Sequence, residues 1–213
     1  MASPKRILIT AGNTREMIDP VRYLSNISTG VMGYELAKVS RKAGYPTTLI
    51  SGPALLKSPA GVRFIGITTS TELENALRRE FPRCDVLFMT SAVCDFRPAR
   101  FSANKIKRRA NFSLKLVKTP DILKGLAARK GKKTVVGFCL ETEDLLLHAR
   151  RKLFEKKVDY IVANFLGRGN RPFGFHPTTV YILSKDGAVT CLKKTAKSKV
   201  ARFLLKTVLN PAR

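Results

Sequence analysis

The stretch formed by residues 7–33 constrains the fold more than any other part of the chain. It opens with an apolar Ile-Leu-Ile run at residues 7–9, which predicts a strand of a parallel sheet that is buried on both faces. A long polar loop follows, and residues 32–43 are predicted as a helix because apolar side chains recur at helical spacing. A strand, a loop of small residues and a helix start form the phosphate cradle of many α/β proteins. The stretch therefore predicts an α/β fold with an anion site at the helix start.

The loop in this stretch does not carry the dinucleotide-binding fingerprint. Gly12-Asn13-Thr14-Arg15 stands in place of G-x-G-x-x-G, and the loop is longer than a Rossmann turn, which argues against a nicotinamide dehydrogenase. Residues 25–30 end at the predicted helix start, where free backbone N–H groups and hydroxyls can hold an anion. An ordinary loop with capping Ser and Thr is the alternative. We favour a binding site because this one loop holds the polar residues Asn13, Thr14, Arg15, Asp19, Arg22, Asn26, Ser28 and Thr29.

The rest of the chain alternates between predicted strands and helices. Residues 179–183 and 188–192 are predicted to form a hairpin around Lys185-Asp186-Gly187. The order predicts a three-layer, Rossmann-like α/β sandwich with a mostly parallel sheet, folded as a single domain over residues 1–213. The other predicted strands are residues 47–53, 62–68, 85–89, 133–138 and 159–163, and the other helices are residues 72–81, 119 to about 129, 142 or 143 to about 157, and 197–209.

Finer predictions concern two helix starts and the segment between them. Thr71 is predicted as the N-cap of the helix at residues 72–81, with Glu74 as its capping-box partner. Pro120 is predicted at the first helical position of the next helix. Between the two helices, residues 97–109 are predicted as a basic loop or flap, and residues 112–117 as an edge strand.

The formal net charge of +25 predicts polyanionic partners, either nucleic acid or small phosphorylated substrates. A basic α/β protein that binds nucleic acid is therefore one hypothesis, but the chain lacks aromatic stacking clusters and any recognised nucleic-acid motif. No acidic residue follows Asp186, and we interpret the basic tail as a solvated helical face rather than a binding surface. The basic residues of this tail are Lys193, Lys194, Lys197, Lys199, Arg202, Lys206 and Arg213.

Several other classes of protein are disfavoured by the sequence. No apolar run approaches the ~20 residues of a membrane span, and residues 1–6 are too short for a signal peptide. The histidines are only His148 and His176, which argues against a His-based metal site or a Ser-His-Asp triad. The cysteines are scattered, without C-x-x-C, so neither a zinc site nor a disulfide framework is predicted and the reducing cytoplasm fits best. They are Cys84, Cys94, Cys139 and Cys191.

Three further stretches carry polar residues where they would follow the carboxyl ends of the parallel strands, which is where ligands bind in open α/β sheets. In residues 91–97, Asp95 can bind Mg²⁺ or a ribose hydroxyl, although a helix cap or a pair with Arg97 is equally open. Lys105 and Lys107 alternate to one side of a basic run, which suits a polyphosphate or simply a solvated surface.

The third stretch is a helix with two lysines one turn apart. Lys152 and Lys156 stand at positions i and i+4, so they share one helix face. Like charges there repel mildly, and an anion would neutralise them. The alternative is an ordinary basic helix surface.

An ordered set of motifs gives these stretches a family resemblance. The chain resembles phosphopantothenoylcysteine synthetase, the bacterial CTP-dependent phosphopantothenate–cysteine ligase, over almost its whole length. That family forms homodimers and often occurs fused behind a flavin-dependent decarboxylase, which has no counterpart in this sequence. The chain is therefore either a stand-alone synthetase, with the decarboxylase as a separate partner, or an excised domain. The motifs, in order, are TAGNTREMIDPVRYLSNISTGVMG, SAVCDFRPA, NKIKR, KLVKTPDIL, VVGFCLETEDL, ARRKLFEKKVDYIVAN and FGFHPTTVYIL.

The resemblance implies a reaction in two halves. CTP and Mg²⁺ activate the carboxylate of 4′-phosphopantothenate as an acyl-cytidylate, and pyrophosphate leaves. The amine of L-cysteine then attacks the acyl group and CMP leaves. Lysines, N–H groups and a metal would offset the repulsion between the two anions, and a flap at residues 97–109 would shield the acyl-cytidylate from water.

The resemblance also implies site residues, carried over position by position. Asn26 and Lys105 match catalytic positions, and Asp95 matches a position for the nucleotide and its metal. The substrate positions are Gly12, Asn26, Ser28, Gly30 and Ala92. The CTP positions are Met89, Thr90, Ser91, Asp95, Lys105, Pro120, Asp121, Ile122, Leu123, Phe138, Lys152 and Lys156.

The chain departs from the family pattern at several positions. Arg108 replaces the last lysine of K-x-K-K, which keeps the charge but not the geometry of a lysine. Ser91 stands where the family has Ala, and Phe165 where it has Asp, so both change the expected pocket. Asn26, Asp95 and Lys105 remain. The other departures are Val31 in place of a basic residue, and His176 and Thr178 in place of an acid and an amide.

Overall fold

The computed structural model describes residues 4–108, 110–167 and 169–210. Its centre is an eight-stranded sheet in the order β12-β11-β10-β9-β6-β1-β4-β5. From β5 to β10 the strands run parallel, and β11 and β12 add an antiparallel edge. The mostly parallel α/β sheet is thus confirmed. The strands are β1 (Ile7–Ala11), β4 (Thr47–Ser51), β5 (Arg63–Gly66), β6 (Val86–Met89), β9 (Thr134–Glu141), β10 (Tyr160–Phe165), β11 (Thr178–Ser184) and β12 (Val189–Thr195).

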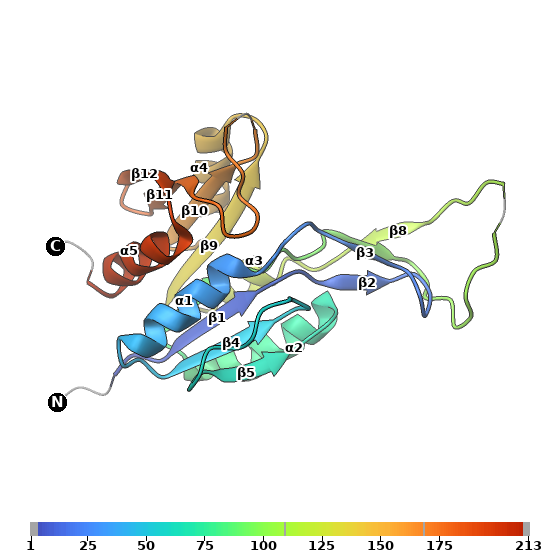
Figure 1. Ribbon diagram of the computed structural model, residues 1–213, viewed down its shortest axis with the longest axis horizontal. Helices are drawn as coiled ribbons and strands as arrows, with labels where there is room; N and C mark the ends of the chain where they lie inside the picture. The colour runs from blue at the N-terminus through green and yellow to red at the C-terminus, as the bar shows by residue number, and fades with distance from the viewer. Residues whose placement is uncertain (1–3, 109, 168, 211–213) are drawn as a thin grey trace.

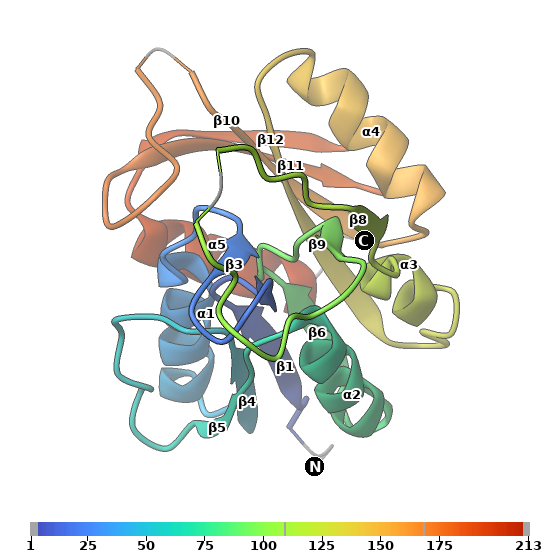
Figure 2. The ribbon, with the colours of Figure 1, turned by 90° about the vertical axis from the view of Figure 1, so that its right-hand side faces the viewer.

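Helices cover both faces of this sheet (Figure 2). Side chains alternate along a strand, so Leu8 packs with one helix layer while Ile7 and Ile9 pack with the other. One layer holds α1 (Val31–Lys42) and α5 (Lys197–Leu209). The other holds α2 (Ser70–Glu80), the short 3₁₀ turn η1 (Phe81–Arg83), α3 (Ile122–Ala127) and α4 (Leu145–Glu155). In the described residues, none of these helices combines the length and apolar character needed to span a bilayer.

An arm projects from the sandwich at the carboxyl ends of the parallel strands (Figure 1). Its described residues are 15–25, 96–108 and 110–118, and it contains two antiparallel ribbons, one of β2 (Arg15–Met17) with β3 (Tyr23–Ser25) and one of β7 (Phe96–Pro98) with β8 (Leu116–Lys118). The buried Asp19 fastens its two halves together. The Asp19 carboxylate accepts hydrogen bonds from the Arg22 side chain and from the Ile106 amide at 3.1 Å.

Several predicted boundaries are wrong, and the arm accounts for two of them. The polar loop after the first strand contains the β2–β3 hairpin. Residues 112–117 do not form an edge strand of the main sheet, since only Leu116–Lys118 is extended there and it pairs with β7. Both ribbons are short and largely exposed, so they leave no apolar alternation in the sequence.

The helix starts also differ from the prediction. The N-cap of α2 is Thr69 rather than Thr71: its hydroxyl accepts from the Glu72 amide at 3.1 Å, and the Glu72 carboxylate accepts from the Thr68 amide. The N-cap of α3 is Asp121, so Pro120 lies before the helix rather than at its first position. Helix α4 begins at Leu145, after residues 142 and 143, while α5 covers residues 197–209 as predicted.

Candidate active site at the carboxyl edge of the sheet

Two loops that are far apart in sequence are joined at the carboxyl edge. Because β1 and β6 are parallel neighbours, their pairing continues past Thr10 and Met89 into the loops that follow. The Ala92 amide donates to the Gly12 carbonyl at 2.8 Å, and the Thr14 amide donates to the Ala92 carbonyl at 3.2 Å. The first and second predicted site loops therefore form one continuous floor.

The start of α3 is attached to the same floor. The Thr119 amide donates to the Asp95 carbonyl at 2.9 Å, and the Thr119 hydroxyl donates to the Cys94 carbonyl at 2.5 Å. Asp121 then caps the helix by accepting from the Lys124 amide at 3.0 Å. The TPDIL segment is thus placed opposite the loop that carries Ala92 and Asp95.

These loops enclose a cavity of about 870 Å³, which we call the main cavity. It lies against β9 and the end of α4 and gathers most of the predicted site residues. A smaller cavity of about 210 Å³, the rear cavity, shares the walls Ser91, Ala92 and Phe138 with it. The rear cavity is lined by the predicted residues Ser28, Gly30 and Thr90, and the main cavity by Asn26, Met89, Ser91, Ala92, Asp95, Pro120, Asp121, Ile122, Leu123, Phe138, Lys152 and Lys156.

Two predicted residues lie outside both cavities. Lys105 is exposed on the arm, next to Ile106, which is bonded to Asp19. Gly12 has a φ of 71°, and a Cβ on it would come 2.9 Å from the Gly52 carbonyl oxygen. Gly12 therefore allows the first loop to pack against the end of β4, which is a structural role rather than a contact with the cavity.

The two lysines of α4 meet carboxylates of the protein itself. Lys152 Nζ lies 2.5 Å from Glu141 Oε1, and Lys156 Nζ lies 3.1 Å from Asp121 Oδ2. His148 Nδ1 lies 3.3 Å from the other oxygen of Glu141. The lysines thus carry counter-charges before any ligand binds, and a polyphosphate has to compete with these carboxylates for them.

Asn26 and Asp95 face the main cavity from opposite loops. The Asn26 amide nitrogen donates to the Val93 carbonyl at 2.8 Å, and the Asn26 carbonyl accepts from Asn13 Nδ2 at 2.9 Å. Asp95 is exposed, and among the described residues it forms no salt bridge, so the pair with Arg97 is not seen. Asp95 is therefore the carboxylate of this cavity that is available to a cation.

The side chains of the cavity suit a Mg²⁺ ion that is held jointly by the protein and by the phosphates of a bound nucleotide. Across the described ranges, no three His, Cys, Asp or Glu side chains come together as a metal cluster. Mg²⁺ commonly takes one or two carboxylates and completes its shell with substrate phosphates and water. The single available carboxylate of Asp95 fits that pattern and does not fit a dedicated protein cage.

Two of the departures from the family pattern have local explanations. The Ser91 hydroxyl donates back to the Ala11 carbonyl at 3.0 Å, so the extra oxygen is satisfied by β1. The Thr178 hydroxyl donates to Asn164 Oδ1 at 3.0 Å, and Asn170 Nδ2 donates to the same oxygen at 2.9 Å. Thr178 therefore helps to fix the 169–177 loop that borders the rear cavity.

Sequence reasoning missed three residues that shape the site. Glu141 ends β9 at the carboxyl edge, and that position was a usable signal for its contact with Lys152. Cys139 lines both cavities, where burial raises the pKa of its thiol to about 11, so it is not a thiolate nucleophile at neutral pH. Lys197 is buried, against the interpretation of the basic tail as a solvated face.

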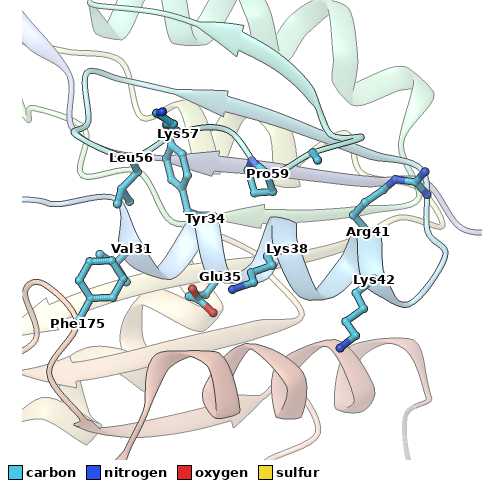
Figure 3. A pocket seen from close by; sticks show the side chains of 11 residues that line it. Val31, Tyr34, Glu35, Lys38, Arg41, Lys42, Leu56, Lys57, Pro59 and Phe175 are labelled. Carbon is cyan, nitrogen blue, oxygen red and sulfur yellow. The ribbon is translucent and has the colours of Figure 1, made fainter.

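A separate cavity of about 470 Å³ lies on the outer side of α1 (Figure 3). Cationic side chains surround it, and Glu35 is the carboxylate among its lining residues. Within the described residues, none of the predicted site residues lines it, so we do not place the chemistry there. Its cationic lining residues are Lys38, Arg41, Lys42 and Lys57.

Comparison with known proteins gives consistent matches over the whole sandwich and arm. Residues 2–211 match the family model described as DNA/pantothenate metabolism flavoprotein C-terminal domain. A Bacillus subtilis (strain 168) relative, "Coenzyme A biosynthesis bifunctional protein CoaBC", is 38% identical over 206 residues, which are 96% of this chain and 51% of the relative. The chain thus spans about half the length of the curated relatives it matches.

Two solved structures share the fold. The crystal structure of the C-terminal domain of Coenzyme A biosynthesis bifunctional protein CoaBC has a TM-score of 0.82 and 36% identity, covering 96% of this chain and 93% of that one. A Cab2 mutant in complex with phosphopantothenate-cysteine has a TM-score of 0.78 and 18% identity, covering 96% and 85%. At that identity, the second likeness concerns the fold alone.

Proposed function

We propose that this chain, which belongs to the family of the DNA/pantothenate metabolism flavoprotein C-terminal domain, is a phosphopantothenate–cysteine ligase of coenzyme A biosynthesis. The main cavity is the observation that carries the proposal, because it unites Asn26 and Ala92 with Asp121, Lys152 and Lys156 in one space. The name of the Bacillus subtilis relative supports it. We take residues 1–213 to act as one ligase domain.

The proposed reaction begins with CTP and 4′-phosphopantothenate. A carboxylate oxygen of the substrate attacks the α-phosphorus of CTP, the bond from that phosphorus to the bridging oxygen breaks, and pyrophosphate leaves. The amine nitrogen of L-cysteine then attacks the acyl carbon, CMP leaves with the former carboxylate oxygen, and the amine releases a proton. The products are 4′-phosphopantothenoylcysteine, CMP and pyrophosphate.

In this proposal the nucleotide occupies the end of the main cavity near α3 and α4. Lys152 and Lys156 supply positive charge where two anions approach each other, which is the main barrier to the first step. Their pairs with Glu141 and Asp121 hold the ammonium groups in position until phosphate oxygens take over. Asp95 would hold Mg²⁺, and the ion, when bound, neutralises phosphate charge.

Asn26 and the arm complete the proposed machinery. Asn26 borders the junction of the two cavities, where the acyl group would lie. Lys105 lies outside the cavity in this chain, so the arm must fold over the site or arrive from a second copy in a homodimer. The free cysteines fit a cytoplasmic enzyme, and a flavin-dependent decarboxylase is the partner we propose for it in the same biosynthesis.

The test is a coupled pyrophosphate assay with the purified chain. With phosphopantothenate, cysteine and CTP, we expect one pyrophosphate for each phosphopantothenoylcysteine, and a parallel reaction with ATP measures the nucleotide preference. Lys152→Gln should raise the KM for the nucleotide about tenfold, the loss of one charge-assisted hydrogen bond. Arg150→Gln, on the exposed side of the same helix, is the matched control. If the folded protein bound CTP and phosphopantothenate but released no pyrophosphate and formed no product, the proposal would be wrong.

A further inference from the structure

The cavity on the outer side of α1, which we call the outer cavity, has a cationic end and an apolar end (Figure 3). Lys38, Arg41 and Lys42 lie toward the end of the helix, while Val31 and Phe175 lie at its beginning. A helix rises about 1.5 Å per residue, so Val31 and Lys42 stand about 16 Å apart along its axis. The cavity volume of about 470 Å³ lies within the roughly 300–1,000 Å³ of small-molecule sites. The outer cavity therefore suits an elongated ligand of nucleotide size.

The cations of the outer cavity form no ion pairs in the part of the chain that the structure describes. The described ion pairs all lie outside α1, α5 and the loop between β4 and β5. Lys38 and Lys42 are i and i+4 on one helix face, where like charges repel. A helix C-terminus favours cations, which accounts for Arg41 and Lys42 but not for Lys57, which comes from the loop. Even with Glu35, the lining keeps a net positive charge that attracts anions.

The loop between β4 and β5 holds one of these cations close to the cavity. Gly61 in this loop has a φ of 73°, and a Cβ on it would come 2.6 Å from Arg41 Nε. The Arg41 side chain thus lies directly against the loop that also carries Lys57, and the glycine leaves room for it. Two segments that are separate in the sequence therefore direct their positive charges to one space instead of spreading them over the surface.

A buried hydroxyl group also lines the outer cavity. Tyr34 is 7% exposed and belongs to the cavity wall. Among the described residues, none of the side-chain hydrogen bonds involves the Tyr34 hydroxyl. A buried tyrosine hydroxyl usually has a partner, because leaving a buried polar group unsatisfied costs free energy. An oxygen of a ligand in the outer cavity would supply that partner.

The apolar end of the outer cavity presents an aromatic ring. Phe175 is 70% exposed at this end, and Val31 and Leu56 of the adjoining core lie beside it. An exposed aromatic ring can stack on a flat ring of a ligand, as aromatic side chains do on nucleobases. The ligand that fits both ends is therefore anionic at one end and carries a flat ring at the other.

We propose that the outer cavity binds a small molecule that joins a diphosphate group to a flat ring, as a nucleoside diphosphate does. The several anionic oxygens of the diphosphate match the neighbouring cations Lys38, Arg41 and Lys42, and the ring stacks on Phe175. The proposal goes beyond the ligase reaction and does not depend on it, since these side chains line the outer cavity and the main cavity has other walls. It gives a use to part of the net charge of +25.

The first experiment places a fluorescent reporter in the outer cavity. The chain contains no Trp, so Phe175→Trp gives a protein with a single Trp, and the new ring keeps the stacking contact. We expect ADP, the probe, to change the Trp fluorescence in a saturable way. AMP should bind about tenfold more weakly because it loses charge-assisted hydrogen bonds, and adenosine should cause no change at the same concentrations. An equal response to adenosine and ADP would contradict the proposal.

Paired substitutions in this reporter protein test the cations. Lys38→Gln with Arg41→Gln should raise the Kd for ADP roughly tenfold or more. Lys199→Gln with Arg202→Gln is the matched control, because it removes the same two charges, at the same spacing, from exposed positions of α5 outside the outer cavity. The control pair should leave the Kd unchanged. Equal weakening by both pairs would indicate a diffuse attraction to the whole face and would overturn the proposal.

Further variants separate the outer cavity from the proposed active site. Tyr34→Phe should weaken ADP binding roughly 2- to 10-fold at an unchanged melting temperature, and Lys152→Gln should leave the Kd for ADP as it was. If Lys152→Gln removed the signal and the Lys38 and Arg41 pair did not, ADP would occupy the main cavity and the proposal would be wrong. Displacement of ADP by a single-stranded oligonucleotide with a lower Kd would assign this face to nucleic acid and overturn it too.

Failure of this proposal and failure of the ligase function would appear in different measurements. Without ADP, the protein with Lys38→Gln and Arg41→Gln should release pyrophosphate at the wild-type rate, because the outer cavity takes no part in the chemistry. A reporter protein that binds ADP through these residues but makes no product would contradict the ligase function alone. A protein that makes product while ADP leaves the reporter unchanged would contradict only the outer site.

Discussion

The carboxyl edge of the sheet and the arm hold their site residues in different ways. At the edge, backbone hydrogen bonds between neighbouring loops fix the cavity walls, as between Ala92 and Gly12. On the arm, Lys105 is exposed, and the segment around it is fastened through Asp19 to the other half of the arm rather than to the sandwich. The cavity is therefore preformed, whereas the contribution of Lys105 depends on where the arm lies. Variants that affect one region but not the other test this division.

The largest effect is expected on the arm. Lys105→Gln should leave the fold intact and lower turnover by a factor on the order of 10²–10³, because it removes a charge that stabilises a developing anion. The measurement is steady-state pyrophosphate release, with a melting curve to establish that the sandwich is unchanged.

Lys115→Gln is the matched control for this variant. Lys115 is another exposed lysine of the arm, and it stands outside the KIKR run. If the folded Lys105→Gln protein catalysed the reaction at a near-normal rate, Lys105 would have no part in the chemistry. The proposed division between a preformed cavity and an arm that supplies Lys105 would then be wrong.

The next effect is expected where the arm joins the edge. Asn26→Asp loses the donor that bonds to the Val93 carbonyl and places a carboxylate beside the anionic acyl phosphate. We expect CTP still to bind, while amide formation slows by a factor on the order of 10² and the acyl-cytidylate accumulates. Mass spectrometry of a quenched mixture of CTP, phosphopantothenate and enzyme measures the intermediate.

Two results would contradict this role of Asn26. Product formation at the wild-type rate would make the residue dispensable, and loss of CTP binding would place it at the nucleotide instead. If Asn26 only supports the loop, the variant should mainly lose thermal stability, which a melting curve run beside the assay detects. Asn111→Asp, on an exposed part of the arm, controls for the added charge.

The same division separates what the sequence predicts well from what it does not. The apolar runs of β1 and β6 are sufficient to predict buried parallel strands, and their register then brings residues 12–14 and 91–95 together. The arm strands are three residues each and are joined by contacts such as Asp19 with Ile106, which are 87 positions apart. No local pattern contains such a contact.

Charge partners were the other feature that the sequence analysis missed. Lys152 and Lys156 were correctly placed at one helix face, but their partners Glu141 and Asp121 come from β9 and the start of α3. Lys197 belongs to a tail whose lysines are mostly exposed, and its burial depends on the loop that carries Gly174. Burial of a single side chain is decided by packing between distant elements rather than by composition.

A change in the sandwich should affect global stability without a direct effect on the arm. A Cβ on Gly33 of α1 would lie 2.6 Å from the Ala11 Cβ and 2.8 Å from the Thr10 carbonyl oxygen. Gly33→Ala therefore forces α1 away from β1, and we expect a loss of about 1–3 kcal/mol in the free energy of unfolding, measured by urea denaturation. Gly125→Ala in α3, where the new Cβ meets no atom within 4 Å, should be neutral or slightly stabilising. Equal destabilisation by both variants would contradict close packing at Gly33.

The smallest effect concerns acid and should be confined to the arm. Hydrogen bonds from the Arg22 side chain and from the backbone of Val21, Arg22 and Ile106 hold the pKa of the Asp19 carboxyl well below its ordinary value of 3.8. The open arm then binds more protons than the closed arm, so the stabilisation by Asp19 is complete above about pH 4 and is lost as the pH falls further. Amide hydrogen exchange of residues 101–108, corrected for the intrinsic rate, should show protection that decreases below pH 4 in the wild-type protein. In Asp19→Asn it should be low and independent of pH, while exchange in β1 stays the same in both proteins. If the protection of residues 101–108 in the wild-type protein stayed constant from pH 6 to pH 3, Asp19 would not fasten the arm. The difference between the fixed carboxyl edge and the arm would then have another cause.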